Sequence, residues 1–353
     1  MRLLLFNLAV DLEDEVLAFA TTWINELAKE VDQIDTITMK KGKVNVSENV
    51  SVYSAGKERG FSRSRRLFRF YRILLSLLTN YSYDGCFSHM MPLFSAAGGP
   101  FLYTFNIPLI TWYAHRNQTT TLKWAHLFSS HVVSVNESSY PYKKDKFVSL
   151  GHGIDTSYFS PADSSKIRPP LILSVGRLSP IKDPKTFIEA MSIIRARGVD
   201  FEALLVGDAP ERDRPYKQEL INLIDRKDNH GRVQLEGSVP YQDIISYYRQ
   251  CTIHINSSPP DHSVDKAALE AMASGKPSLT SVKALKPTLG RYRDELFFEY
   301  GNPKHLANKM SKLLKKPDTE LRSMGEYLRE RIQEKHSLKH LKSNLISLLE
   351  SSR

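Results

Sequence analysis

Residues 261–277, DHSVDKAALEAMASGKP, place several charged side chains at the start of a short apolar helix. In one interpretation, Ser263 or Asp265 caps the first turn and Gly275 ends the helix. In the other, the exposed amides and the positive end of the helix dipole bind an anion such as a phosphate. The local sequence leaves both interpretations open.

Two further cations lie near the start of another helix. Arg177 follows the apolar segment LILSVG, and Lys182 immediately precedes a helix, where a cation opposes the helix dipole. Ligands of open α/β sheets bind outside the carboxyl ends of the strands, so two cations at that edge suit a diphosphate. The alternative is two solvated loop cations.

The elements that position these residues follow an alternating pattern. Short β-rich segments alternate with longer segments of helical period, which predicts parallel strands joined by helical crossovers. The pattern restarts at LILSVG, after a stretch rich in Gly, Ser and Pro. We therefore expect an N-terminal α/β domain over residues 1–160, a C-terminal α/β domain over residues 161–335 and a final helix over residues 336–353.

Length and composition agree with two folded domains. The chain has 353 residues, of which 41% are hydrophobic and 25% charged. Its two cysteines lie far apart, without the spacing of a zinc site, so a reducing compartment is expected. The first strand is not followed by a glycine-rich dinucleotide loop, and the chain has no P-loop. Residues 86–115 lack Lys, Arg, Asp and Glu, but prolines and glycines divide them into pieces too short to span a bilayer as one helix.

The net charge of +10 is concentrated in one segment. Its basic residues are Lys57, Arg59, Arg63, Arg65, Arg66, Arg69 and Arg72. Apolar residues at helical spacing follow, so the segment is either an amphipathic helix with a solvated arginine face or a contact for an anionic membrane surface. Nucleic acid is not expected, because the aromatic residues fall on the apolar face.

Several motifs occur together in a distinctive order. They are GHGIDTSYF, SVGRLSPIKDPKTFIEAM, LLVGDAPERDRPYKQEL, VQLEGSVPYQDIISYYRQC and SSPPDHSVDKAALEAMASGKP. Residues 151–282 thereby resemble the carboxyl-terminal half of glycosyltransferase family 4. The resemblance implies the GT-B fold, with two doubly wound Rossmann-like domains facing across a cleft and a final helix crossing back to the first domain.

The resemblance also implies a donor site on the second domain. Arg177 and Lys182 would hold the diphosphate of a nucleotide sugar, amides and side chains from Ser263 to Lys266 would meet the distal phosphate, and Glu270 would bind the ribose. Transfer would retain the anomeric configuration and need neither a metal nor a cofactor besides the donor substrate.

One position departs from the family pattern. The family's Glu-x7-Glu motif has its first glutamate where this chain has His262. Asp265, with Lys266 beside it, is the expected substitute in contact with the sugar and phosphate. The alternative is that Lys266 pairs with Glu270 at i and i+4 while Asp265 only caps the helix.

The first domain offers weaker candidates. His115 follows an apolar strand and resembles the family's histidine near the reacting sugar, although a hydrogen-bonded histidine at a strand end is the alternative. His89, also at a strand end, is a candidate acceptor contact. The family's glycine-rich first loop is missing, and Asp11 lies in its place.

These features predict a cytoplasmic retaining glycosyltransferase, peripheral on the membrane if the basic segment binds lipid. Its partners would be a nucleotide sugar and a glycan, glycolipid or polysaccharide acceptor. The alternative is a catalytically silent GT-B-like protein that binds nucleotide sugars or acts as a scaffold. A third hypothesis, an anionic-membrane or nucleic-acid binding protein, rests on charge alone.

Overall fold

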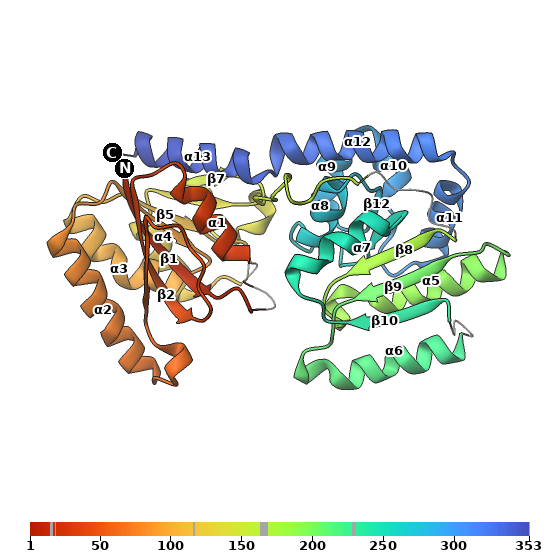
Figure 1. Cartoon of the computed structure of the whole chain (residues 1–353), viewed down its shortest axis with the longest axis horizontal. Coiled ribbons are helices and arrows are strands. Elements are labelled where there is room, and N and C mark those ends of the chain that lie inside the picture. Colours follow the sequence, from red (N-terminus) through yellow and green to blue (C-terminus); the bar gives the residue numbers. More distant parts are fainter. Residues whose placement is uncertain (15–16, 18, 116, 163–168, 228–230, 353) are drawn as a thin grey trace. The chain divides into compact units, whose positions relative to one another are not determined.

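The computed structural model describes residues 1–14, 17, 19–115, 117–162, 169–227 and 231–352 (Figure 1). It divides into two compact units, one formed by Met1–Gly153 with Leu338–Arg353 and the other by Ile154–Ser337. The chain therefore passes from the first unit to the second after Gly153 and returns after Ser337. The sequence pattern predicted these two boundaries at residues 160 and 335. The last helix groups with the first unit.

The first unit is built on a parallel sheet. Its seven strands lie in the order β3-β2-β1-β4-β5-β6-β7, and every pairing is parallel. The strands are β1 (Arg2–Val10), β2 (Gln33–Lys41), β3 (Val50–Ser54), β4 (Gly85–His89), β5 (Leu109–Trp112), β6 (His131–Ser134) and β7 (Phe147–Ser149).

The helices of the first unit cover both faces of this sheet. They are α1 (Phe19–Ala28), α2 (Arg63–Asn80), α3 (Pro92–Thr104), α4 (Thr120–Phe128) and α13 (Leu338–Ser351). Right-handed crossovers place α2, α3 and α4 on one face and α1 on the other, because the chain moves from β1 toward β2 but from β3 toward β6 in the opposite direction. Ser62 and Thr119 cap α2 and α4 by accepting hydrogen bonds from backbone amides of the first turn.

Aromatic side chains join α2 and α3 to the sheet. The Phe70 ring stacks on the Phe94 ring with centroids 4.2 Å apart, and the Phe6 ring meets both edge-on at 5.5 and 5.9 Å. A Cβ at Gly98 would lie 3.2 Å from Phe6, so the glycine allows α3 to approach the sheet closely. This cluster is the centre of the first core.

The second unit repeats the same topology with five parallel strands in the order β10-β9-β8-β11-β12. The strands are β8 (Leu171–Val175), β9 (Glu202–Val206), β10 (Val233–Gly237), β11 (Ile253–Asn256) and β12 (Ser278–Thr280). Its helices are α5 (Pro184–Ala196), α6 (Arg214–Arg226), α7 (Ile244–Gln250), α8 (Lys266–Ala273), α9 (Lys286–Leu289), α10 (Arg293–Leu296), α11 (Pro303–Leu314) and α12 (Asp318–Lys335).

Both units are doubly wound, as the family resemblance implied, and their strands are parallel, as the alternating pattern predicted. In the second unit the strand order reverses between β8 and β11, which are neighbours although β9 and β10 separate them in the chain. The loops that follow β8 and β11 therefore leave the sheet side by side. Doubly wound sheets bind ligands at this topological switch point.

The uncharged segment 86–115 contains most of β4 and all of α3 and β5, so it is divided into short elements, as its prolines and glycines predicted. Across the described ranges, no helix combines the length and the apolar character needed to cross a membrane.

The aromatic cluster generates a stability prediction. Phe94→Ala removes a ring that is 1% exposed, and we expect it to lower the free energy of unfolding of the first unit by about 3–5 kcal/mol. Tyr103→Ala on the same helix is the control, because that side chain is 77% exposed and its loss changes stability by less than about 0.5 kcal/mol. Urea unfolding followed by tryptophan fluorescence measures both. Equal effects of the two substitutions would contradict the packing described.

Candidate functional site

The loop after β8 turns sharply before α5. Gly207, with φ of +130°, lies so close to this loop that a Cβ there would come 2.2 Å from the Gly176 carbonyl oxygen. Asp183 adopts a left-handed conformation with φ of 45°, and its carboxylate accepts a hydrogen bond from the Thr186 amide at 3.3 Å as the N-cap of α5. The hydroxyl of Ser257, after β11, donates to the carbonyls of Lys182 and Asp183 at 2.9 Å. The two loops at the switch point thus hold each other in place.

An ion pair joins the same two loops. The Lys182 ammonium contacts the carboxylate of Asp265, whose side chain is 8% exposed. Asp265 Oδ2 also accepts from the Ser258 hydroxyl at 3.2 Å, and Oδ1 accepts from the Ala267 amide at 3.3 Å as the N-cap of α8. Burial alone would raise the pKa of this carboxyl group, but the Lys182 charge and hydrogen bond hold the pKa well below its usual range. Asp265 is therefore ionised at neutral pH.

A small pocket of about 20 Å³ opens beside this pair. Its polar lining includes Arg177, Lys182, Asn256, Ser257, Ser258 and Asp265. Arg177 is exposed and forms no ion pair with any residue that the structure describes. The pocket has room for about one water molecule, so a larger anion would meet these groups at its mouth.

Glu270 lies in a neighbouring buried cluster. Tyr241 Oη donates to Glu270 Oε1 and Tyr248 Oη donates to Oε2, both at 3.0 Å. The Lys266 ammonium lies 3.4 Å from Oε1 and 3.0 Å from Tyr241 Oη. Burial raises the pKa of Glu270 against the opposing effects of Lys266 and the tyrosines, and burial lowers the pKa of Lys266. The carboxylate thus has a protein partner on each oxygen.

The structure separates the predicted donor residues into two groups. Arg177, Lys182 and Asp265 line one pocket, whereas Lys266 and Glu270 belong to the adjacent cluster. Of the two capping candidates, Asp265 is the cap of α8, and it uses the amide that was expected to be open to phosphate. The Lys266–Glu270 pair proposed as the alternative to phosphate binding is present, because i and i+4 lie on one helix face.

Ser263 and His262 precede this helix and are half-buried. The Nδ1 atom of His262 lies 2.9 Å from the Ser263 carbonyl oxygen, which assigns the proton to Nδ1. Besides Lys182, the neighbouring His262 contributes to lowering the pKa of Asp265.

The two candidate histidines of the first unit, His115 and His89, have different environments. His115 is exposed after β5, and its Nδ1 accepts from the Asn117 amide at 3.2 Å. His89 is 6% exposed at the end of β4, with ring centroids of Trp23 and Trp112 at 4.8 and 6.0 Å. Burial among aromatic rings leaves His89 little surface for an acceptor, whereas His115 is accessible. Both roles stay predictions.

Asp11, which follows β1, is buried and paired. Its carboxylate lies 2.9 Å from the Lys40 ammonium, which lowers the pKa of the carboxyl group. A Cβ at Gly42 would overlap the Asp11 carboxylate at 2.1 Å, so the acidic side chain occupies the space beside that glycine. This part of the first unit presents a neutralised pair instead of free backbone amides.

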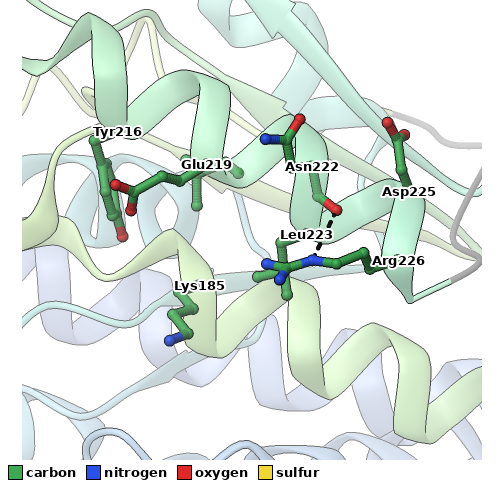
Figure 2. A pocket seen from close by; sticks show the side chains of 8 residues that line it. Lys185, Tyr216, Glu219, Asn222, Leu223, Asp225 and Arg226 are labelled. Carbon is green, nitrogen blue, oxygen red and sulfur yellow. Dashed lines mark hydrogen bonds between the residues drawn. The ribbon is translucent and has the colours of Figure 1, made fainter.

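A larger surface pocket of about 620 Å³ lies between α5 and α6 (Figure 2). Its charged lining residues, Lys185, Glu219, Asp225 and Arg226, are two cations and two anions, and Arg226 donates to the Asn222 carbonyl of its own helix at 3.3 Å. None of the predicted site residues lines it. The mixed charges do not converge on one type of ligand, so the smaller pocket is the candidate site.

The described part of the chain holds no group of three or more His, Cys, Asp or Glu side chains arranged for a metal ion.

The buried ion pair generates a second prediction. Asp265→Asn leaves the Lys182 ammonium without its counter-charge, and we expect a loss of about 3–5 kcal/mol in unfolding free energy at pH 7. Lys182→Met/Asp265→Asn removes both charges and should recover part of that loss, as a double-mutant cycle by urea unfolding would measure.

The same pair predicts a pH dependence. Because the folded-state pKa of Asp265 is lowered, its stabilisation is complete above the unfolded-state pKa of about 3.9 and is lost as the pH falls toward the folded-state value. Wild-type stability should therefore fall more steeply than that of Asp265→Asn as the pH drops from about 5. If the free energies of unfolding of the wild type and of Asp265→Asn fell equally with pH, the pair would contribute no stability.

Part of the chain matches a known family model. Residues 169–316 match the family model described as Glycosyl transferases group 1. Spore coat protein SA of Bacillus subtilis (strain 168) is 23% identical over 247 residues, a match that covers 64% of this chain and 64% of that protein. The chain thus spans less than two thirds of the curated relative.

Solved structures match the whole chain. HepE of Anabaena in complex with UDP matches with a TM-score of 0.79 at 17% identity. The match covers 99% of this chain and 100% of the HepE chain. Sucrose-phosphate synthase from Thermosynechococcus elongatus also has a TM-score of 0.79, at 18% identity, covering 99% of this chain and 98% of its own. The fold of this chain is GT-B, and the fold and the family-model match together support a GT-B glycosyltransferase.

Proposed function

We propose that this protein transfers a sugar from a nucleoside-diphosphate sugar to a hydroxyl group of a glycan, glycolipid or polysaccharide. The observation that carries the proposal is the convergence of Arg177 and Lys182 at the switch point of the second sheet, inside the segment that matches Glycosyl transferases group 1. HepE, whose fold is similar, has been solved with UDP and with UDP-glucose. Uridine nucleotides are therefore the first donors to test.

The diphosphate would bind at the mouth of the small pocket. Arg177 offers a guanidinium group with several N–H donors and no ion pair among the described residues. Lys182 shares its ammonium with Asp265, but an ammonium has three donors, so donors remain for a phosphate oxygen. Two cations and one carboxylate leave the site net positive toward a diphosphate.

Asp265 is best assigned as a positioning residue. Its oxygens already accept from Lys182, Ser258 and the Ala267 amide, so the carboxylate acts on the donor through Lys182. This assignment replaces the expected direct contact with the sugar.

Glu270 is retained as the proposed ribose contact, through Oε1. Tyr248, the partner of Oε2, is fully buried, whereas Tyr241, the partner of Oε1, is half-buried and lies nearer the surface. A ribose hydroxyl would replace the Tyr241 hydroxyl as the hydrogen-bond donor to Glu270 Oε1.

The proposed reaction retains the anomeric configuration. The bond between the anomeric carbon and the diphosphate oxygen breaks, and Arg177 and Lys182 stabilise the negative charge that the leaving group gains. The acceptor oxygen bonds to the same face of the sugar, and its proton passes to the departing phosphate. No protein base is required, and His115 would lie near the reacting sugar.

We place the enzyme in the cytoplasm. The two cysteines are buried free thiols, which supports a reducing compartment.

Nucleotide binding is the direct test of the donor site. In a thermal-shift panel of UDP, GDP, ADP, CDP and dTDP, we expect one series to stabilise the protein by about 2.7 kcal/mol at roughly 100 times its dissociation constant. Arg177→Ala should weaken that binding roughly tenfold to a hundredfold, because a charge-assisted hydrogen bond is lost. Arg226→Ala, in the larger pocket, is the control and should bind as wild type. Unchanged affinity in Arg177→Ala would refute the diphosphate assignment.

Turnover with the donor so identified tests the chemistry. Nuclear magnetic resonance of the product should show the anomeric configuration of the donor, and activity should persist in EDTA. Asp265→Asn should lower kcat and raise the donor KM together, since Lys182 loses its orientation.

An inverted product would overturn the retaining mechanism, and loss of activity in EDTA would overturn metal independence. Because His262 stands where the family has a glutamate, a protein that binds the donor but transfers no sugar to any acceptor class would instead be a silent nucleotide-sugar-binding relative.

A further inference from the structure

The helices α2, α3 and α4 expose many large apolar side chains on the side that faces away from their sheet. Phe68 is 70% exposed, Tyr103 77% and Trp124 51%. We call the set the α2–α4 surface. It comprises Leu67, Phe68, Leu75, Leu93, Tyr103, Phe105, Trp124 and Leu127.

These side chains belong to one continuous layer. Stacking of Phe70 on Phe94 joins α2 to α3 on the buried side, and the Phe128 side chain of α4 lies against Gly99 of α3. Figure 1 shows α2 and α3 along the same edge of the first unit. Because the inward stripes of the helices already pack on the sheet, the exposed residues lie on other faces, and Phe68 with Leu75 on α2 and Trp124 with Leu127 on α4 each share one outward face.

The charge of this layer has a single sign. Asp84 is the sole acidic residue in the sequence from Arg59 to Asn136, and it accepts a hydrogen bond from the Arg2 amide at 2.6 Å, outside the three helices. Arg63, Arg65, Arg72 and Lys123 are exposed on α2 and α4.

Two other arginines of α2 turn toward the protein. Arg69 donates to the Ser54 carbonyl at 2.7 Å, and Arg66 lies 3.5 Å from the Met39 sulfur. The arginines of α2 therefore fall into two groups. Arg66 and Arg69 contact the protein, whereas Arg63, Arg65 and Arg72 are exposed to solvent.

We propose that the α2–α4 surface docks on an anionic lipid bilayer. Its apolar side chains would enter the boundary between headgroups and acyl chains, its tryptophan and tyrosine would lie at headgroup depth, and its cations would contact lipid phosphates. Arg65 and Arg72 alternate with Phe68 and Leu75 along one stripe of α2, so both contacts are made in the same orientation.

Charge and side-chain type favour lipid over other occupants. A second copy of this surface would place like charges opposite one another, which is unfavourable. Nucleic acid would use the cations and aromatic rings but would leave Leu67, Leu75, Leu93 and Leu127 without partners. This inference does not depend on the proposed transfer reaction.

Vesicle sedimentation of the full chain tests the proposal. We expect binding to vesicles of phosphatidylcholine mixed with phosphatidylglycerol, weaker binding to phosphatidylcholine alone, and weakening at high salt. Trp124→Ser/Leu127→Ser should lower the partition coefficient roughly tenfold or more. Arg65→Ser and Arg72→Ser should each lower it about fivefold.

The matched control is Tyr300→Ser/Arg212→Ser, an exposed aromatic and an exposed arginine of the second unit, which should partition as wild type. Unchanged thermal unfolding of each variant shows that it remains folded.

Equal binding to neutral vesicles, or wild-type partitioning of Trp124→Ser/Leu127→Ser, would overturn the proposal. So would a chain that ignores vesicles and instead forms dimers, in sedimentation velocity, that this double substitution abolishes.

Discussion

The ion pair between Lys182 and Asp265 is the interaction on which the second unit's site depends. It joins the loop that follows β8 to the start of α8, two segments 83 residues apart in the chain. The same carboxylate caps α8, and the same lysine is the proposed phosphate ligand. A buried aspartate is costly unless it is paired, so the helix cap and the cation stabilise each other. The proposed donor binding would therefore depend on the same Lys182–Asp265 pair that stabilises the local fold.

Backbone geometry at the switch point makes this pairing available. Gly207 lets the loop after β9 approach the Gly176 carbonyl more closely than a side chain would permit, and Asp183 takes up a left-handed conformation that Ser257 and Thr186 hold in place. Strain of about 1–3 kcal/mol at such a residue persists only where the surroundings determine it. Lys182 immediately precedes this left-handed Asp183 cap of α5, and its ammonium reaches Asp265 at the start of α8.

Local patterns in the sequence predicted the alternating strands and helices of two α/β domains, because propensity and periodicity act over a few residues, whereas the doubly wound sheets were implied by the family resemblance. The patterns also singled out Arg177, after a strand, and Lys182, whose unfavourable placement before a helix is visible in the chain. The tyrosine partners of Glu270 could not be predicted, since Tyr241, just before α7, and Tyr248, in α7, contact it only in the folded unit. The burial of His89 under Trp23 and Trp112 is likewise a tertiary effect. Strands as short as β7 and β12 carry too few residues for periodicity to register.

The basic helix α2 illustrates why an amphipathic pattern does not by itself decide between packing and docking. Phe70, Leu74 and Leu77 form the inward stripe and are buried, as an ordinary helix packed on a sheet requires. Phe68 and Leu75 occupy a different face and stay exposed after the inward stripe is satisfied. Folding of this domain explains the first stripe but not the second, because water is a poor environment for large apolar groups beside unpaired cations. The two interpretations that the sequence left open are therefore compatible: one stripe of the helix packs on its own sheet, and the other remains available to an apolar, anionic surface.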